Sequence, residues 1–416
     1  MTRTKHRAHP TPSFPVSCLG FTDDTTLLLG GGGGPSRTGI KNKLKICTAS
    51  LDGRTLSEVA EHVFEPGEDL PTSMAINVET KQVVVGVNAP ETTIKASSPG
   101  QGNDHCRAFS YADNKLEMVK STQTITAPWN DDYPYQKLTA FSPRLDLLAV
   151  GTTDIDGTQS TVTLLTYPGM DFVWKWESTD SKIDGELVDI DFAADGSSLA
   201  ITTTTTINVF NVTSASNGSK EGIERTASIP LPTLGADPVT FRSAKFNRQP
   251  SPTPTIHAII NTDPKPLPRG KGKRPTVLKK GYCVNFSLAE ATGDEKAKTL
   301  KGKWEMTGKR EVGNVPVSAF EISADGMVLA YAAADYSIGL LDARTLAPLL
   351  KILHAHSFAI TALAFNPSGN LLASAGADNT VRLIVIPASF GSSTMMIAAV
   401  LIALMLALAA YFLQTR

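Results

Sequence analysis

The stretch of sequence that decides the fold lies near the C-terminal end, where residues 354–384 read HAHSFAITALAFNPSGNLLASAGADNTVRLI. Apolar runs at residues 362–365 and 371–375 flank an Asn-Pro-Ser-Gly turn, and a third apolar run begins at Val381. Short apolar runs separated by Gly, Pro, Asn and Asp are typical of neighbouring antiparallel strands. The stretch therefore predicts three strands of one small sheet.

Three polar residues in this stretch resemble the hydrogen-bonded set of a WD repeat. His356, Ser374 and Asp378 match that set, whereas Ile384 stands where the repeat usually has a tryptophan. A histidine, a serine and an aspartate could also form a catalytic triad. We interpret the three residues as structural, because they fall on the positions that hold the strands of a WD blade together.

A related pattern, in which an apolar strand ending in Phe is followed by a turn and a second apolar run, recurs along the chain. Sheets of four short strands that recur at a spacing of about 40–50 residues are typical of propeller blades. We predict an all-β fold, a seven-bladed β-propeller of degenerate WD repeats that occupies residues 1–390. The predicted blades are residues 14–65, 70–120, 137–178, 187–230, 239–305, 317–350 and 359–386.

The seventh predicted blade has only three clear strands. We expect residues 2–8 to supply the fourth, because this would close the ring and remove an open sheet edge. The two ends of the propeller would then lie side by side. Within the ring, the threonine run at residues 202–206 predicts a buried strand. Trp174 and Trp176, two residues apart, predict one strand face that packs between blades.

Composition argues against several classes of function. The net charge of −1 gives no general attraction for nucleic acid, so we expect no nucleic-acid partner. No acid–base pair or nucleophile constellation stands out, so we expect neither bond chemistry nor a small-molecule substrate. The four cysteines show no Cys-x-x-Cys pair and no metal-ligand spacing, which is typical of a reducing compartment. They are Cys18, Cys47, Cys106 and Cys283.

The C-terminal end predicts a membrane anchor. Residues 394–413 carry no charge and are almost entirely apolar. About 20 such residues, rising about 1.5 Å each, span a hydrocarbon core of about 30 Å. A buried core helix is the alternative. No polar residue of the kind that such a helix would show interrupts the apolar run, so the run favours a membrane-spanning helix. Because this segment leaves the ribosome last, we expect residues 1–390 in the cytosol, one transmembrane helix at 394–413 and a lumenal tail at 414–416.

A basic segment rich in Pro and Gly, residues 264–280, interrupts the fifth predicted blade. It contains no aromatic residue, and such a composition is typical of a solvated loop. Contact with anionic lipid headgroups is the alternative, since each cation near such a surface gains about 1 kcal/mol. The sequence leaves both interpretations open.

Five consecutive glycines, Gly30 to Gly34, separate two predicted strands of the first blade. Ordering such a run costs about 1–2 kcal/mol per residue. A phosphate-binding loop is excluded, because Ile40 and Lys41 follow Gly39 where that loop needs Lys and Ser or Thr, and because a strand pattern follows instead of a helix. A flexible loop and a cation site built from backbone carbonyls both remain possible.

The glycine-rich stretch resembles one family. The glycines, followed by Gly39-Ile40-Lys41-Asn42-Lys43 and later by Glu68-Asp69-Leu70-Pro71-Thr72, are similar to segments of the endoplasmic-reticulum guanine-nucleotide exchange factors for Sar-type GTPases. That family starts COPII coat assembly and consists of seven-bladed propellers with a C-terminal membrane anchor. The resemblance implies a Sar-type small GTPase as the partner and the endoplasmic reticulum membrane as the location.

The resemblance also implies roles for individual residues. It implies a potassium ion as cofactor, held by Gly32, Gly33, Gly34 and Asn42. It implies that the nucleotide site of the GTPase is engaged by Thr38, Gly39, Ile40 and Asn42, with Ile40 as an apolar probe. Arg37 and Lys41 depart from the family pattern and make this loop more basic, which could change its affinity for a cation or the carbonyls that coordinate it.

Two other functions are compatible with a propeller. One is a tail-anchored scaffold without exchange activity, in which the glycine-rich stretch is a flexible loop. The other is an enzyme with a site in the central channel, which requires polar or charged residues on the innermost strands of several blades. Those strands read mostly as Ala, Ser and Val, so the sequence favours the scaffold over the enzyme.

Overall fold

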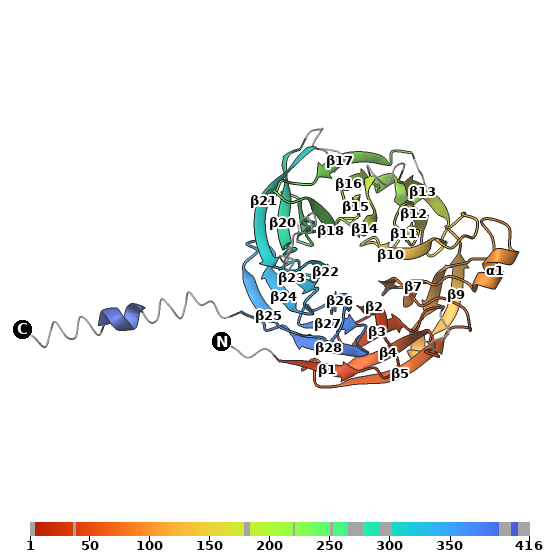
Figure 1. Ribbon diagram of the computed structural model, residues 1–416, viewed down its shortest axis with the longest axis horizontal. Coiled ribbons are helices and arrows are strands. Elements are labelled where there is room, and N and C mark those ends of the chain that lie inside the picture. The colour runs from red at the N-terminus through yellow and green to blue at the C-terminus, as the bar shows by residue number, and fades with distance from the viewer. Residues whose placement is uncertain are drawn as a thin grey trace, which may run out of the picture.

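The chain forms a ring of seven antiparallel sheets around a central channel (Figure 1). The computed structural model describes residues 5–35, 39–178, 184–218, 221–249, 253–264, 278–291, 302–390 and 401–406. Each of the seven sheets has four strands. The predicted all-β fold and the predicted number of blades are therefore confirmed.

Within blades 1 to 6 the strands run outward from the channel in chain order. Blades 1 to 3 comprise β2 (Val16–Phe21), β3 (Thr26–Gly31), β4 (Lys43–Ala49), β5 (Leu56–Val63); β6 (Met74–Asn77), β7 (Gln82–Gly86), β8 (Cys106–Ser110), β9 (Glu117–Thr122); and β10 (Tyr135–Phe141), β11 (Leu147–Thr153), β12 (Ser160–Thr166), β13 (Phe172–Glu177). Blades 4 to 6 comprise β14 (Leu187–Phe192), β15 (Ser198–Thr203), β16 (Thr206–Asn211), β17 (Glu224–Pro230); β18 (Val239–Phe246), β19 (Thr255–Thr262), β20 (Gly281–Ala291), β21 (Gly302–Gly313); and β22 (Val317–Ile322), β23 (Val328–Ala333), β24 (Ile338–Asp342), β25 (Pro348–Ile352).

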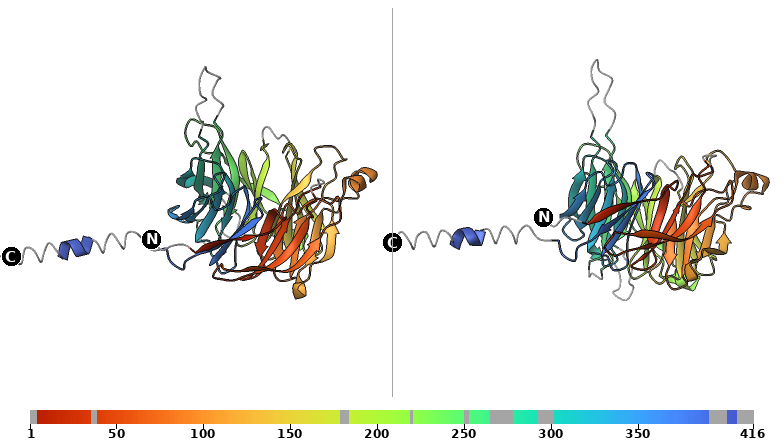
Figure 2. Two further views of the ribbon diagram at one scale, coloured as in Figure 1. Left: turned by 60° about the horizontal axis from the view of Figure 1, so that its bottom comes forward. Right: turned by 90° about the horizontal axis from the view of Figure 1, so that it is seen from below.

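Blade 7 joins the two ends of the propeller. It comprises β26 (Ile360–Phe365), β27 (Leu371–Gly376), β28 (Thr380–Val385) and, outermost, β1 (His6–Pro10). Figure 2 shows the red N-terminal strand beside the blue C-terminal strands. The predicted closure is confirmed, but the strand lies at His6–Pro10 rather than at residues 2–8. The pairing reaches Pro10 because the next N–H, that of Thr11, still bonds to the carbonyl of Asn379 at 2.8 Å.

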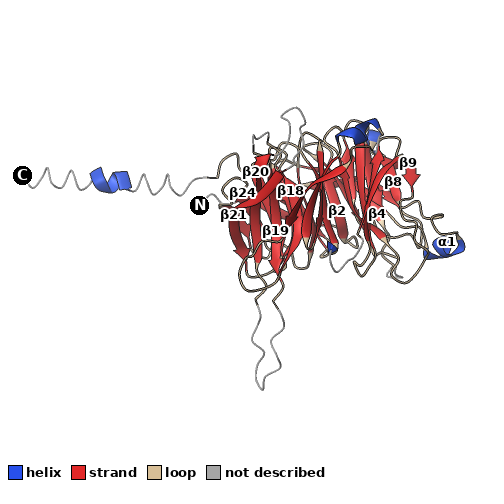
Figure 3. Ribbon diagram, turned by 90° about the horizontal axis from the view of Figure 1, so that it is seen from above, coloured by secondary structure: helices blue, strands red, loops and turns tan. Residues whose placement is uncertain are grey.

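In the described parts of the connections between strands lie three short helices: α1 (Glu91–Ala96), η1 (Ala112–Asn114) and η2 (Thr213–Asn217). Alternate connections open on opposite faces of the disk, because every blade is an antiparallel meander. Connections between second and third strands, such as residues 32–42, share one face with the links from one blade to the next. We call this face the glycine-loop face, and Figure 3 shows the strands edge-on between the two faces.

The apolar core lies mainly between adjacent blades. Trp174 of β13 stacks obliquely on Phe210 of the next blade, with 5.0 Å between ring centroids, and Trp176 packs against the same cluster. The predicted inter-blade packing of both tryptophans is therefore confirmed. Each fully buried large apolar side chain contributes about 1.5–3 kcal/mol, so the blades stabilise one another by burial.

The threonine run at residues 202–206 is not one strand, contrary to the prediction. Strand β15 ends at Thr203, β16 begins at Thr206, and Thr204 and Thr205 form the turn. The hydroxyl of Thr203 accepts the N–H groups of Thr205 and Thr206, at 3.3 and 3.2 Å. Such a side-chain bond favours a turn over a continuing strand.

Several predictions fall on residues outside the described part of the chain. Of the predicted membrane segment 394–413, only residues 401–406 are described, and they are helical. Among the described residues, no helix has both the length and the apolar character needed to cross a membrane. Thr38 and residues 265–277 of the basic segment also lie outside the described residues. The four cysteines are described, and all are buried with free thiols.

Candidate functional site

The glycine loop, defined as residues 32–42, connects β3 to β4 on the glycine-loop face. Gly30 and Gly31 belong to β3 and pair with β4, so the run of glycines is half strand and half loop. A Cβ atom on Gly31 would lie 2.1 Å from the carbonyl oxygen of Pro15. Glycine is therefore required here by the close approach of neighbouring backbone.

Asn42 organises the buried base of the loop and is only 8 % exposed. Its Oδ1 accepts the N–H of Gly34 at 2.9 Å, and its Nδ2 donates to the carbonyls of Gly34 at 3.1 Å and Glu68 at 2.8 Å. A Cβ atom on Gly32 would lie 2.2 Å from the same Oδ1. Three of the residues implied to hold a cation thus meet, with Gly33 between them in the chain.

Residues 68–70 form the wall against which the glycine loop packs. Glu68 pairs with Arg107, with 2.6 Å between Oε1 and Nη1, and both side chains are nearly buried. A Cβ atom on Gly34 would lie 3.3 Å from Leu70 and 3.9 Å from Oδ1 of Asp69. Burial raises the pKa of Asp69, and the N–H of Leu70 opposes part of that shift. The largely buried carboxylate of Asp69 therefore lies beside the glycine loop. Among the residues that the structure describes, no cation pairs with it.

Sequence reasoning did not include Asp69 in the site. Residues 68–72 supported the family resemblance, but none of them was assigned a role. The available signal was two adjacent acidic residues, followed by a leucine and a proline. That signal does not reveal that Glu68 pairs with Arg107, or that no cation among the described residues pairs with Asp69. Both outcomes depend on the packing of blade 2 against blade 1.

The far end of the glycine loop reaches the surface. Gly39 is exposed, has a φ of +76°, and a Cβ atom built on it would meet nothing within 4 Å. Ile40 is partly exposed, and Lys41 is exposed. Gly39 and Ile40 are therefore accessible to a partner, and their engagement of a GTPase stays a prediction.

The central channel is lined by charged side chains, so the expectation of mostly Ala, Ser and Val was wrong. The cavity holds about 470 Å³. Asp189 of β14 pairs with Lys245 of β18 at 2.9 Å, and Asp191 pairs with Arg248 at 2.7 Å. Burial raises the pKa of Glu321 on β22, with Lys245 opposing. The sequence does not show this cluster of charges, because its members come from several blades that only the closed ring brings together.

Asp189 and Asp191, two of the channel carboxylates, join blades 4 and 5. Asp189 also accepts the N–H of Ala244 at 3.1 Å, and Asp191 accepts the N–H of Phe246 at 2.7 Å. Each carboxylate is thus satisfied by a cation and a backbone donor of the next blade. This arrangement stabilises the ring and gives neither carboxylate a free role in bond chemistry.

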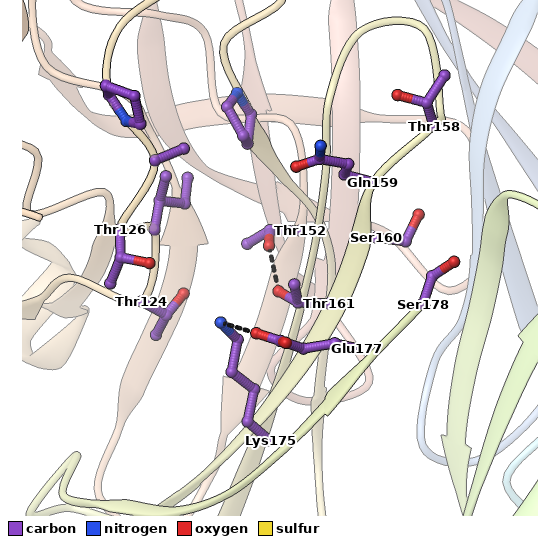
Figure 4. Close-up of a pocket in the computed structure, with 14 residues that line it drawn as sticks. Thr124, Thr126, Thr152, Thr158, Gln159, Ser160, Thr161, Lys175, Glu177 and Ser178 are labelled. Atoms are coloured by element: carbon purple, nitrogen blue, oxygen red, sulfur yellow. Dashed lines mark hydrogen bonds and ion pairs between the residues drawn. The ribbon is translucent and has the colours of Figure 1, made fainter. Parts of the chain in front are cut away.

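A second concave region lies at blade 3 on the glycine-loop face (Figure 4). Its volume is about 700 Å³, and hydroxyl-bearing residues line much of it. Thr152 of β11 and Thr161 of β12 share a hydrogen bond of 2.6 Å in its wall, and Lys175 and Glu177 form an ion pair of 2.5 Å. The two charged residues that line it neutralise each other, so this groove offers hydrogen bonds rather than a strong charge.

The His356 set holds blade 7 together, as predicted. Nε2 of His356 lies 2.8 Å from the Ser374 hydroxyl, and Nδ1 lies 3.1 Å from both oxygens of Asp378. Burial lowers the pKa of His356, and Asp378 opposes that shift. Ser374 is fully buried, so no substrate could reach its hydroxyl. Ile384, in the place of the usual tryptophan, is also fully buried and fills space without a hydrogen bond.

Comparisons with known proteins agree with this fold. A family model described as "WD domain, G-beta repeat" matches residues 347–384. The chain is 21 % identical over 360 residues to SEC12-like protein 2 of Arabidopsis thaliana, covering 84 % of this chain and 73 % of the relative. It is 21 % identical over 385 residues to the guanine nucleotide-exchange factor SEC12 of Candida glabrata, covering 91 % of this chain and 72 % of the relative. The predicted resemblance is therefore confirmed over most of the chain.

Proposed function

We propose that this protein is a guanine-nucleotide exchange factor for a Sar-type small GTPase. It acts at the endoplasmic reticulum membrane, with the propeller facing the cytosol, and starts COPII coat assembly. One structural observation carries the proposal. The glycine loop has a buried base tied down by Asn42 and a surface end that presents Ile40. Similarity over 91 % of the chain to a protein named as an exchange factor supports it.

Exchange follows from binding alone, without bond chemistry. A protein that binds the nucleotide-free GTPase more tightly than the loaded one must weaken nucleotide binding by the same factor. Ile40 enters the nucleotide site of the GTPase as an apolar probe, flanked by Thr38 and Gly39. The anchored base reduces the entropy lost on binding, because Gly34 is already hydrogen-bonded to Asn42 and the N–H of Gly32 to the carbonyl of Pro15.

We further propose that the base of the loop holds a potassium ion, because its donors are of the right chemistry. Backbone carbonyls of Gly32, Gly33 and Gly34, together with Oδ1 of Asn42, are the neutral oxygens that hard cations prefer. The carboxylate of Asp69 adds a negative charge beside them that no described cation neutralises. A bound ion would order the loop and offset the cost of burying that charge.

A membrane-attached scaffold without exchange activity is the second candidate. The hydrogen-bonding groove at blade 3 favours it, because a protein-binding surface of this kind needs no glycine loop. In that case the uncharged segment 394–413 would still attach the propeller to the membrane. The two candidates differ in what Ile40 does.

Nucleotide release from a Sar-type GTPase, followed by the fluorescence of a labelled guanine nucleotide, separates the two candidates. We expect the full chain in detergent to accelerate release in potassium buffer, more weakly in sodium buffer, and Ile40→Ala to lose at least about tenfold of the acceleration. Ile155→Ala is the matched control, since Ile155 is exposed on the same face in the connection between β11 and β12. Equal rates with and without the wild-type chain would leave only the scaffold.

A further inference from the structure

The innermost strands share a backbone irregularity near the glycine-loop face. In six of the seven blades a register shift interrupts the pairing of the first strand with the second and leaves one residue bulged. A β-bulge leaves that residue unpaired and re-aims its side chain. The bulged residues all line the central cavity, and they are Ser17, Lys137, Val188, Arg242, Ser318 and Thr361.

Most bulged residues bond to the next blade. The hydroxyls of Ser17, Ser318 and Thr361 lie within hydrogen-bonding distance of a carbonyl in the following blade, and Thr72 does the same in blade 2. The acceptors are Pro71 for Ser17, Gln136 for Thr72, Ile360 for Ser318 and Val16 for Thr361. Lys137 uses its ammonium group, which donates to the carbonyl of Leu187 at 2.8 Å.

Arg242 breaks this pattern. The carbonyl that it would meet in blade 6, that of Val317, already accepts Nδ2 of Asn261 at 2.9 Å. The N–H of Val317 donates to Oδ1 of the same asparagine, also at 2.9 Å. Asn261 therefore makes the bond between blades 5 and 6. Within the described part of the chain, the guanidinium of Arg242 has no hydrogen-bond or ion-pair partner, so its five donors are available.

Among the described residues, no carboxylate pairs with Arg242 either. The other cations of the cavity wall have carboxylate partners: Lys137 with Glu186, Lys245 with Asp189, and Arg248 with Asp191. Arg242 takes in β18 the bulge position that Ser318 and Thr361 take as the second residues of their strands, which start at the glycine-loop face, so Arg242 lies toward that end of the channel. Arg242 is partly exposed, which leaves it open to a group that enters from that face.

We propose that Arg242 binds a single carboxylate, an aspartate or glutamate side chain of the GTPase that docks on the glycine-loop face. The inference rests on the proposed function and adds a second contact to it, in the channel mouth. A guanidinium matches a carboxylate in shape and can bind it through two parallel hydrogen bonds. One uncompensated positive charge suits one carboxylate better than a phosphate ion, which carries nearly two negative charges at pH 7.

The test measures the affinity of the full chain for the nucleotide-free GTPase. We expect Arg242→Gln to raise Kd about tenfold, since a charge-assisted hydrogen bond is lost, and Arg242→Glu to raise it further by repulsion. Arg242→Lys, which keeps the charge, should fall between wild type and Arg242→Gln. Arg344→Gln, at an exposed arginine on the opposite face, is the matched control. Circular dichroism should show the same Tm for all four variants, because Arg242 makes no bond within the described fold.

A charge-reversal scan identifies the partner group. One acidic residue of the GTPase, changed to lysine, should restore binding to Arg242→Glu but not to Ile40→Ala. Wild-type affinity in both Arg242→Gln and Arg242→Glu, with exchange still lost in Ile40→Ala, would overturn this inference and leave the proposed function standing. A wild-type chain that neither binds nor accelerates the GTPase would overturn both.

Discussion

The base and the surface end of the glycine loop lie within the same eleven residues but differ in burial and hydrogen bonding. The base is buried, and Asn42 ties it to Gly34 and to Glu68 of the next connection. The surface end has open space around Gly39, and Ile40 is partly exposed. Stability should therefore depend on the base, and partner binding on the surface end. Two substitutions in the glycine loop and two directly beside it test that division.

The largest loss of stability should come from Gly31→Ala. The new Cβ atom would lie 2.1 Å from the carbonyl oxygen of Pro15, which is backbone and cannot move aside cheaply. Overpacking of this kind costs about 1–3 kcal/mol, and we expect the upper end of that range or more. The measurement is the Tm of the full chain by circular dichroism. Gly39→Ala is the control, where only the left-handed backbone is penalised, by about 1 kcal/mol. Equal losses in the two variants would contradict the division.

Asn42→Ala should come next. It removes three hydrogen bonds and leaves the N–H and C=O of Gly34 and the carbonyl of Glu68 without that partner. We expect a loss of about 2–3 kcal/mol in unfolding free energy, together with loss of exchange activity. Asn211→Ala, at a partly exposed asparagine in blade 4, is the comparison. A variant with full stability would show that the base is not held by this side chain.

Asp69→Asn should have a smaller effect with the opposite sign. Because burial raises the pKa of Asp69 in the folded state, the fold binds more protons than the unfolded chain. The ionised form of Asp69 therefore destabilises the fold at neutral pH. This penalty disappears as the pH falls through the pKa that Asp69 has in the folded state. We expect Asp69→Asn to raise Tm at pH 7 in sodium buffer, with the gain shrinking on acidification. The variant should also lose the advantage of potassium over sodium in nucleotide release.

Ile40→Ala should change stability least, by less than about 1 kcal/mol, because the side chain is only partly buried. The same variant is expected to lose most of its exchange activity. Tm and nucleotide-release rate, measured on one preparation, give the contrast directly. A Tm drop as large as that of Asn42→Ala would mean that Ile40 belongs to the core of the loop rather than to its binding surface.

The sequence alone determined the features that depend on local patterns. Seven blades, the closing N-terminal strand, the structural role of His356 and the position of the glycine loop all follow from apolar runs and turn residues spaced along the chain. Such patterns report which residues lie on one strand, because side chains alternate with a period of two. They erred at residues 202–206, where a hydroxyl bond to the backbone made a turn of what looked like a strand.

The tertiary structure decided the features that depend on residues far apart in the chain. Asn42 meets Glu68, Asp189 meets Lys245, and Asn261 takes the carbonyl of Val317 and so frees Arg242. These partners are separated by 26 to 56 residues and come from different blades or their connections. Sequence periodicity says nothing about which polar groups will be buried together. Only the closed ring, by bringing the innermost strands to one axis, determines which of the described charges are paired and leaves Arg242 without an ion-pair partner among them.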